Sequence, residues 1–465
     1  MVLEQFFQPK SIAIIGASRN PNSAGQGVLK SLIKGGVFNS KTNRPFQGKI
    51  YPINPNADKI LGIKCYKSVF EVKGKIELAV IVVPAKIVPY IMEECAKKKV
   101  KGVIIVSAGF SEIGEKGKEL EEKVVNIAKK ASIRIIGPNC LGLMRPKSSL
   151  NASFGPCMPK SGKVAFFSQS GALIDSVIDW SLESNYGFSA VVSIGNKADI
   201  GISELLLWAL QDKETKAIAI YLEGLTDGRK FMKIAKQVAK KKPIVALKAG
   251  RSKTGMKAVS SHTGSLAGSY EIYKTAFNQS GVIVAENVDE LFETADVLAN
   301  LPPCKNNIAI ITNGGGAGVL CADHCEELGI NLAKLSKETV KKLDDSGKMH
   351  PAYSRRNPLD LVGDALHDRY NIAIDTLMKQ KNIHGAIVIQ TLQTMTQPML
   401  DAQAVLKARK KYPKKPIITS YMGGKFTRKA VEFLESNHVP DFNVPYKAAK
   451  AMKALIKRED WLKNN

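Results

Sequence analysis

The chain has 465 residues, 44% of them apolar, which is enough for about three domains with full hydrophobic cores. It carries 68 Lys and Arg against 42 Asp and Glu, a net charge of +26. The lysines lie in short clusters such as 97–99 and 240–242, without a basic tail or interleaved aromatic residues. This pattern favours a lysine-rich surface that attracts small polyanionic ligands, and it disfavours nucleic-acid binding.

The seven cysteines are an odd number and are spread over the chain. No signal peptide is recognised before the first predicted strand, and no apolar run approaches the ~18 residues of a membrane span. We therefore expect a cytoplasmic protein that does not enter a membrane. Cys321, His324 and Cys325 have helical spacing and could ligate a metal, but no fourth ligand is near in sequence, so no metal site is expected.

The first predicted strand, Ser11–Gly16, is apolar and ends in glycine. The turn 17–23 and a helical pattern from Gly25 follow it, which is how a nucleotide-binding βαβ unit begins. The glycine spacing does not match GxGxxG, and the next predicted strand, Lys49–Ile53, ends in Asn54 instead of the Asp or Glu typical of an NAD site. These features disfavour a dinucleotide and leave room for another adenine-bearing ligand.

Three more strands are predicted at 78–83, 102–106 and 134–136, each followed by small or turn residues. Ligands of doubly wound sheets bind at the carboxyl ends of the strands, so a ligand cleft is expected there, with simple turns as the alternative. The candidate residues at these ends are Val83, Pro84, Ala85, Ser107, Ala108, Gly109 and Asn139.

A second series of elements begins with a strand at 163–167, and SQSGA follows at the start of a helix. The N–H groups and hydroxyls of Ser170, Gly171 and Ala172 could bind an anion such as phosphate, a simple helix cap being the alternative. The next strand, 191–194, leads into a polar turn that contains Asn196.

The strand 217–222 delivers Glu223 at its carboxyl end. A carboxylate there can hold one ring nitrogen of a histidine, so that the other nitrogen is free to act as a nucleophile. A solvated loop glutamate is the alternative interpretation.

After a strand at 243–249, the stretch 258–268 reads AVSSHTGSLAG, which predicts a mobile loop of small residues around His262 before a helix from about Ser269. Neutral imidazole is a competent nucleophile near pH 7. We interpret His262 as the carrier of a phosphoryl group, the alternative being an incidental histidine in a flexible loop.

The third region follows a predicted linker at 301–305. A strand at 308–312 runs into a glycine-rich segment and a helix, which makes Gly315 and Gly316 a second candidate phosphate cradle. Glycine at such a position also serves close packing between helix and sheet. Further strands at 385–390 and 416–420 favour a flavodoxin-like domain.

Six short motifs occur together and in order, and as a set they are specific. The set resembles the α subunits of ADP-forming acetyl-CoA (acyl-CoA) synthetases, in the succinyl-CoA synthetase superfamily, over essentially the whole chain. The motifs are GAS at 16–18, GPN at 137–139, SQSGAL at 168–173, SIGNKADI at 193–200, YLEG at 221–224 and SSHTGSLAG at 260–268.

The resemblance implies an α/β fold with three consecutive domains. They are a Rossmann-like CoA-binding domain (1–145), a flavodoxin-like, succinyl-CoA synthetase-like domain with the phosphohistidine (146–300), and a third flavodoxin-like ligase-CoA domain (301–465). The implied reaction is acyl-CoA + ADP + phosphate ⇌ carboxylate + CoA + ATP, through an acyl phosphate and phosphorylated His262. The resemblance further implies that Glu223 hydrogen-bonds this histidine and that Asn196 lies near the acyl group.

The implied CoA site consists of the turn Gly16, Ala17, Ser18 and Arg19, with Asn54 and the strand ends named above. The small molecules implied are CoA or acetyl-CoA, phosphate, and ADP or ATP with Mg²⁺. No ATP-grasp domain is found in the sequence, so the nucleotide is expected on a separate β subunit in an α2β2 heterotetramer. An NAD-dependent oxidoreductase and a non-catalytic CoA- or nucleotide-binding scaffold are the alternatives.

Overall fold

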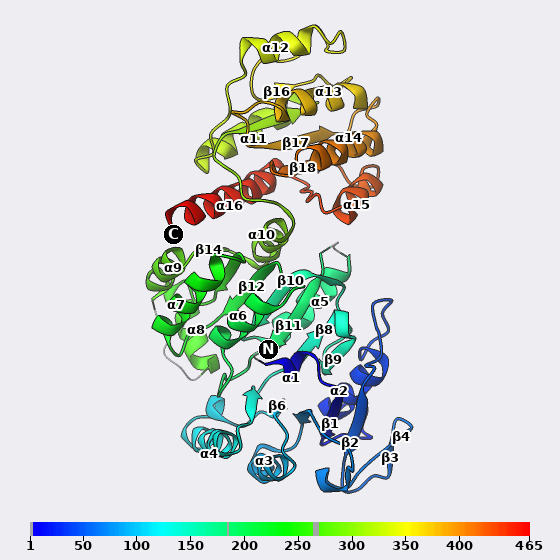
Figure 1. Cartoon of the computed structure of the whole chain (residues 1–465), viewed down its shortest axis with the longest axis vertical. Coiled ribbons are helices and arrows are strands. Elements are labelled where there is room, and N and C mark those ends of the chain that lie inside the picture. The colour runs from blue at the N-terminus through cyan, green and yellow to red at the C-terminus, as the bar shows by residue number, and fades with distance from the viewer. Residues whose placement is uncertain (1–2, 184–185, 264–268) are drawn as a thin grey trace. The chain divides into compact units, whose positions relative to one another are not determined.

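The computed structural model describes residues 3–183, 186–263 and 269–465, and only the backbone of residues 260–263. The chain divides into two compact units, Met1–Ala295 and Asp296–Asn465. The first unit holds a five-stranded sheet, a seven-stranded sheet and a two-stranded ribbon, and the second unit holds a four-stranded sheet (Figure 1). None of the described helices is long and apolar enough to cross a membrane.

The five-stranded sheet is parallel, in the order β2-β1-β5-β6-β7. Its central strands are apolar and buried along their whole length, as strands covered on both faces must be. The strands are β1 (Ser11–Ile15), β2 (Lys49–Ile53), β5 (Leu78–Ile81), β6 (Gly102–Ile105) and β7 (Arg134–Ile136), and the ribbon is β3 (Lys59–Ile60) and β4 (Ile63–Lys64). The helices of this region are α1 (Glu4–Phe7), α2 (Ala24–Lys34), α3 (Val88–Lys97) and α4 (Glu115–Ala131).

The seven-stranded sheet has the order β14-β13-β12-β10-β11-β8-β9, with β8 and β9 antiparallel to their neighbours. Its strands are β8 (Gly142–Arg145), β9 (Leu150–Ser153), β10 (Ser161–Ser168), β11 (Phe188–Ser193), β12 (Ala217–Leu222), β13 (Ile244–Lys248) and β14 (Val282–Val284). The helices are α5 (Gly171–Glu183), α6 (Ile202–Gln211), α7 (Gly228–Ala239), α8 (Lys253–Thr263), α9 (Tyr270–Gln279) and α10 (Val288–Asn300).

The four-stranded sheet of the second unit is parallel, in the order β16-β15-β17-β18. Its strands are β15 (Ile308–Thr312), β16 (Leu359–Asp360), β17 (Gly385–Thr391) and β18 (Ile417–Met422). The helices are α11 (Gly315–Glu327), α12 (Lys337–Asp344), α13 (His367–Met378), α14 (Pro398–Lys411), α15 (Arg428–Ser436) and α16 (Pro445–Asn464).

One strand order recurs in all three sheets. Among the parallel strands of each sheet, the first strand in chain order lies between the second and the third. The three trios are β2-β1-β5, β11-β10-β12 and β16-β15-β17. This is the flavodoxin-like variant of the doubly wound fold, and its ligand crevice opens where the chain leaves the first and third strands in opposite directions. By this rule, ligand crevices are expected at the carboxyl ends of β1 and β5, of β10 and β12, and of β15 and β17.

The structure contains strands that the sequence did not predict, among them the ribbon β3–β4 and the short strands β14 and β16. Two further differences concern the second sheet. The hairpin β8–β9 was not expected, and it extends the second sheet because Val191 and Val192 of β11 pair with Met144 and Leu143. The sequence predicts a loop from Ala258, and this prediction is wrong for the backbone up to Thr263, which is helical and belongs to α8. Residues 256–263 contain neither glycine nor proline, so nothing in them breaks a helix.

Candidate functional site

The turn after β1 is held in a shape that only glycine allows. Gly16 has φ +96°, and a Cβ at this position would lie 2.2 Å from the carbonyl oxygen of Val82. A Cβ on Gly25, at the start of α2, would lie 2.1 Å from the carbonyl oxygen of Gly16. The two glycines thus let α2 and β5 approach the turn closely, although their spacing does not match the dinucleotide fingerprint.

Asn54, at the end of β2, fixes the same turn from the other side. Its Nδ2 donates to the carbonyl oxygen of Ala17 at 2.7 Å, and its Oδ1 accepts the N–H of Asn56 at 2.8 Å. Ser18 accepts the N–H of Asn20 at 3.1 Å, and Arg19 is exposed. The predicted residues Gly16–Arg19 and Asn54 therefore lie together at the crevice between β1 and β5.

The ends of β5 and β6 are tied together by one hydroxyl. The Ser107 hydroxyl accepts the N–H of Val83 at 3.1 Å and donates to the Val83 carbonyl at 2.5 Å. The carbonyl of Ser107 also accepts the N–H of Asn139 at 2.9 Å. A Cβ on Gly109 would lie 3.1 Å from the Cβ of Ala85. The structure thus brings together the strand ends at which Pro84 and Ala108 are exposed.

A carboxylate that the sequence analysis missed shapes the loop after β6. Glu112 accepts the N–H of Gly109 at 2.6 Å and that of Phe110 at 3.1 Å. Burial raises the pKa of Glu112, but the bonds from Asn196 and from these N–H groups outweigh it and bring the pKa below its usual range. Glu112 is therefore ionised at neutral pH.

The second crevice, at the ends of β10 and β12, begins with the amino terminus of α5. The Ser168 hydroxyl accepts the N–H of Ser170 at 3.0 Å, and the Ser170 hydroxyl accepts that of Leu173 at 3.3 Å. The first N–H groups of a helix have no acceptor within it, so Gly171 and Ala172 supply the donors for an anion here.

Glu223 lies on the other side of this crevice and is only 6% exposed. Gln169 holds its backbone, since Gln169 Oε1 accepts the N–H of Glu223 at 2.5 Å and that of Gly224 at 3.0 Å. Gln169 Nε2 in turn donates to the carbonyl of Gly224 at 2.8 Å. A side chain from the end of β10 therefore fixes the backbone that carries Glu223 at the end of β12.

Two lysines place positive charge near Glu223. Lys248 is 1% exposed, and its ammonium lies 4.7 Å from the centre of the Tyr273 ring. Burial lowers the pKa of Lys248, and the charge of Glu223 opposes this shift. Lys197 is half-buried, and its pKa is likewise lowered by burial and raised by the charges of Glu223 and Glu121.

The predicted nucleophile falls partly outside the described residues. The backbone of His262 lies in α8, but the side chains of residues 260–263 and the whole of residues 264–268 are outside the described part. α8 follows β13, which neighbours β12 in the sheet, so the chain leaves β13 beside the strand that carries Glu223.

In the second unit, the crevice between β15 and β17 contains Gly315 and Gly316 at the amino terminus of α11. A Cβ on Gly315 would lie 2.7 Å from Asp360 Oδ2. The preceding loop is held by Asn313, whose Oδ1 accepts the N–H of Thr391 at 2.7 Å. The predicted cradle is thus a narrow turn whose neighbour is a carboxylate.

Cys321, His324 and Cys325, which have the helical spacing of metal ligands, each contact another side chain. Cys321 and Cys325 hydrogen-bond to each other, and His324 lies 3.3 Å from Glu327 through Nδ1. Within the described residues, no group of three or more His, Cys, Asp or Glu side chains could hold a metal ion.

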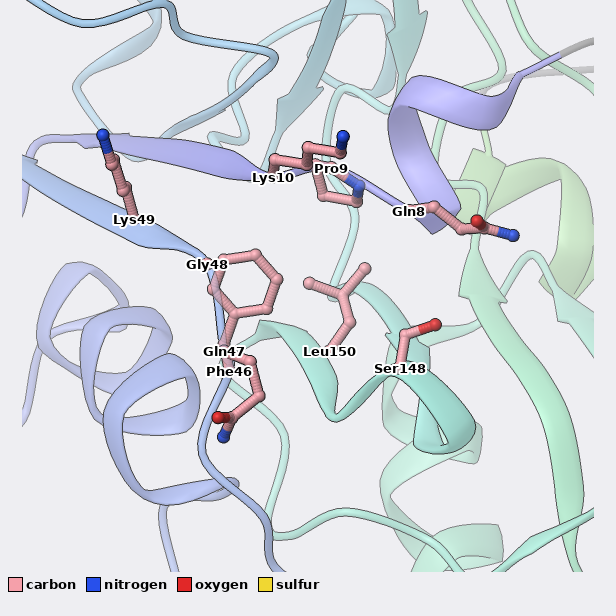
Figure 2. Close-up of a pocket in the computed structure, with 9 residues that line it drawn as sticks. All are labelled: Gln8, Pro9, Lys10, Phe46, Gln47, Gly48, Lys49, Ser148 and Leu150. Atoms are coloured by element: carbon pink, nitrogen blue, oxygen red, sulfur yellow. The ribbon is translucent and has the colours of Figure 1, made fainter.

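A pocket of about 520 Å³ opens at the amino ends of β1 and β2 (Figure 2). Phe46 and Leu150 point into it, and the exposed Lys10 and Lys49 lie at its edge. It lies at the opposite edge of the sheet from the crevice at Gly16, so it is not part of the candidate site.

Comparison with known proteins shows the family of each region of the chain. Residues 10–146 match the family described as CoA binding domain, residues 161–298 the succinyl-CoA ligase like flavodoxin domain, and residues 308–465 the ligase-CoA domain. The acetate–CoA ligase (ADP-forming) I subunit alpha of Pyrococcus furiosus is 43% identical over 99% of this chain and 98% of that subunit. This chain belongs to the ADP-forming acetate–CoA ligase family.

Two further relatives define the extent of the match within the family. The acetate–CoA ligase (ADP-forming) I of Archaeoglobus fulgidus is 42% identical over 97% of this chain, which spans 63% of that longer protein. The solved acetyl-coenzyme A synthetase 1 of Ca. Korarchaeum cryptofilum, in complex with phosphate and ADP, is 36% identical, with a TM-score of 0.91 over 99% of this chain and 97% of that one.

The sequence analysis missed several residues that shape these crevices: Gln169, Lys197, Lys248, Glu112 and Gly25. Lys248 carried a detectable signal, because a charged residue ends an otherwise apolar strand. Lys197 lies within the SIGNKADI motif at 193–200, but nothing local marked its side chain as part of the site. Glu112 carried no signal, because its partner Asn196 is distant in sequence.

Proposed function

We propose that this chain is the α-type subunit of an ADP-forming acyl-CoA synthetase, with acetyl-CoA as its substrate. Phosphate attacks the thioester carbonyl, CoA leaves as the thiol, and acetyl phosphate forms. The imidazole of His262 then takes the phosphoryl group and acetate departs. Phosphohistidine finally transfers the group to ADP, which gives ATP.

The observation that carries this proposal is the second crevice of the first unit. Glu223, fixed by Gln169 at the end of β12, lies across from the amino terminus of α5 at the end of the neighbouring strand. A fixed carboxylate can orient an imidazole, and a helix amino terminus can bind the oxygens of a phosphoryl group. Phosphoryl transfer needs mainly such positioning and charge stabilisation.

The first crevice supplies the proposed CoA site. The turn Gly16–Arg19 offers backbone groups to the CoA phosphates, with Asn54 holding the turn in place. The ends of β5 and β6 at Val83–Ala85 and Ser107–Gly109, together with Asn139, form its wall. Asn196 is assigned to the phosphate- and substrate-binding residues of the first unit, and the Gly315–Gly316 turn is proposed as a phosphate cradle of the second unit in its own right.

ADP and Mg²⁺ are assigned to a partner chain with an ATP-grasp fold, in an α2β2 heterotetramer. This part of the proposal is supported by the name of the Pyrococcus relative, which is a subunit alpha. All seven cysteines are free and buried, which supports a reducing, cytoplasmic location.

The test is phosphoryl labelling of the purified chain together with its partner subunit. With acetyl-CoA and radiolabelled phosphate, we expect acid-labile, alkali-stable label on the wild type and none on His262→Ala. His324→Ala, a substitution in the second unit, is the matched control and should label normally. Label that persists in His262→Ala would refute the assignment of the nucleophile.

Glu223→Gln tests the carboxylate separately. The amide keeps the shape of the side chain but removes the charge that orients the imidazole, so phosphorylation should slow by about 10-fold to 100-fold. Glu214→Gln, an exposed substitution near the other end of β12, is the control. An unchanged labelling rate in Glu223→Gln would remove Glu223 from the mechanism.

A further inference from the structure

The turn between β11 and α6 is attached to the neighbouring sheet by an unusual set of contacts. Nδ2 of Asn196 lies within hydrogen-bond distance of three acceptors, Ser111 Oγ at 3.1 Å, Glu112 Oε2 at 2.6 Å and Glu121 Oε2 at 2.9 Å. Two of these acceptors are carboxylates that converge on one amide group. Such an arrangement holds Asn196 firmly, because bonds to charged acceptors are stronger than neutral ones.

The backbone of the turn is held as well. The N–H of Asn196 donates to the Pro138 carbonyl at 2.9 Å, and the N–H of Ala198 donates to the Gly137 carbonyl at 3.1 Å. Asp199 accepts from Nε of Arg134 at 2.8 Å. The residue between these anchors, Lys197, is left with a positive φ of 63°. The conformation of Lys197 is therefore imposed by its neighbours.

Lys197 lies at the same sheet edge as the amino terminus of α5. The turn continues β11, and the N–H of Ile194 donates to the carbonyl of Ser168 at 2.9 Å, next to Ser170. Glu223 follows β12, on the other side of β10. Lys197 is half-buried, and burial lowers its pKa while the charges of Glu223 and Glu121 oppose that shift.

We propose that Lys197 binds the oxygens of inorganic phosphate in the second crevice and that Asn196 is the positioning residue that holds Lys197 there. The inference rests on the proposed function and extends it by adding a cation to the phosphate site. Lys197 stays protonated throughout and exchanges no proton. The helix amino terminus alone supplies partial charge, whereas Lys197 supplies a full charge near an incoming anion.

The same anchors connect the phosphate crevice to the CoA crevice. Glu112 Oε1 accepts the N–H of Gly109, and Glu112 Oε2 accepts from both the N–H of Phe110 and Nδ2 of Asn196. Removal of Asn196 should therefore disturb phosphate binding more than CoA binding, since the Gly109 loop keeps its own bonds to Glu112.

The test compares steady-state constants in the complex of this chain with its partner subunit. Lys197→Gln should raise the KM for inorganic phosphate by about 10-fold to 100-fold and leave the KM for acetyl-CoA within about twofold. Lys197→Arg keeps the positive charge, so its KM for phosphate should stay close to that of the wild type. Asn196→Ala should raise the KM for phosphate in the same direction by about 5-fold to 20-fold.

Lys242→Met is the matched control for the loss of a half-buried lysine. Lys242 donates to the carbonyls of Ala209 and Asp212 near the amino end of β13, far along the strand from the crevice. Its substitution can lower stability but should leave the KM for phosphate unchanged. Urea unfolding of each variant separates loss of folding from loss of phosphate binding.

The outcomes are distinct. An unchanged KM for phosphate in Lys197→Gln overturns the inference, and so does an equal rise in the KM for phosphate and for acetyl-CoA. If Lys197→Gln fails to fold, Asn196→Ala decides: a raised KM for phosphate in a folded Asn196→Ala, with a near wild-type KM in Lys197→Arg, supports the inference, and a wild-type KM in Asn196→Ala overturns it. Absence of label on wild-type His262 would instead refute the proposed function.

Discussion

Substitution of Gly16 by alanine tests whether the first crevice binds CoA. The added Cβ would lie 2.2 Å from the carbonyl oxygen of Val82 and 2.9 Å from Cγ1 of Val83. The backbone at Gly16 also has φ +96°, a conformation that alanine rarely adopts. Gly62 separates these two effects, because its φ is +81° and nothing lies within 4 Å of a Cβ built there.

The two effects have different sizes. A left-handed conformation costs a non-glycine residue about 1–2 kcal/mol, so Gly62→Ala should lower the free energy of unfolding by about that amount. Forcing a methyl group into packed structure adds about 1–3 kcal/mol, so Gly16→Ala should cost about 2–5 kcal/mol in total. If the turn moves to relieve the clash, its backbone groups move away from the CoA phosphates and CoA affinity falls. A tenfold weaker affinity corresponds to a loss of about 1.4 kcal/mol of binding free energy.

Urea unfolding and calorimetric titration with CoA measure both quantities on the same samples. We expect Gly16→Ala to be less stable than Gly62→Ala and to bind CoA at least about tenfold more weakly than the wild type, while Gly62→Ala binds it normally. Equal stability of the two variants would refute the close approach of β5 to the turn. Normal CoA affinity in a destabilised Gly16→Ala would refute the assignment of this crevice to CoA.

Arg145 donates to Asp212 at 2.7 Å, and both side chains are buried, so Arg145→Met should lower the free energy of unfolding by about 3–5 kcal/mol. In urea unfolding, the double variant Arg145→Met/Asp212→Leu should be more stable than Arg145→Met. Equal stability of Arg145→Met and the wild type would contradict the importance of this buried ion pair. Asp401 is buried, and neither carboxylate oxygen has a hydrogen-bond partner among the described residues. Burial raises the pKa of Asp401 from 3.8 to about 7, with the charge of His367 opposing the shift. The folded state therefore binds the proton more tightly than the unfolded state, so the stability that Asp401 contributes is lost as the pH rises from about 4 to about 7. The urea midpoint should fall between about pH 5 and about pH 8, and this fall should be smaller in Asp401→Asn than in the wild type. An identical fall in both proteins would refute a buried, protonated Asp401.

Part of the site was predictable because its signals are local. Apolar runs followed by polar or small residues located β2, β7, β12 and β15 with their observed bounds and β1 to within one residue, and helical patterns located α2, α5 and α11. Gly16 and Ser170 stand at such junctions, where chain direction changes over a few residues. A local pattern suffices there, because backbone geometry and helix capping depend on neighbouring residues.

Other features escaped because they depend on distant partners. The helical backbone around His262 was mistaken for loop, since serine, histidine and threonine are permissive in either state and only the environment decides. The hairpin β8–β9 is a strand pair only because β11 offers an edge to it. Glu112 and Lys197 look like ordinary surface charges in the sequence.

The sequence by itself determined the alternation of strands and helices, the strand ends that carry small and polar residues, and the presence of Glu223 and His262 in one stretch of βα units. Only the tertiary structure decided which strand ends face each other. The shared strand order places Gly16 beside Val82, and the end of β10 beside Glu223, because the third strand of each sheet pairs with the first. The hydrogen bonds that keep Glu112 ionised, and the close approach that requires glycine at position 16, exist only once the chain has folded.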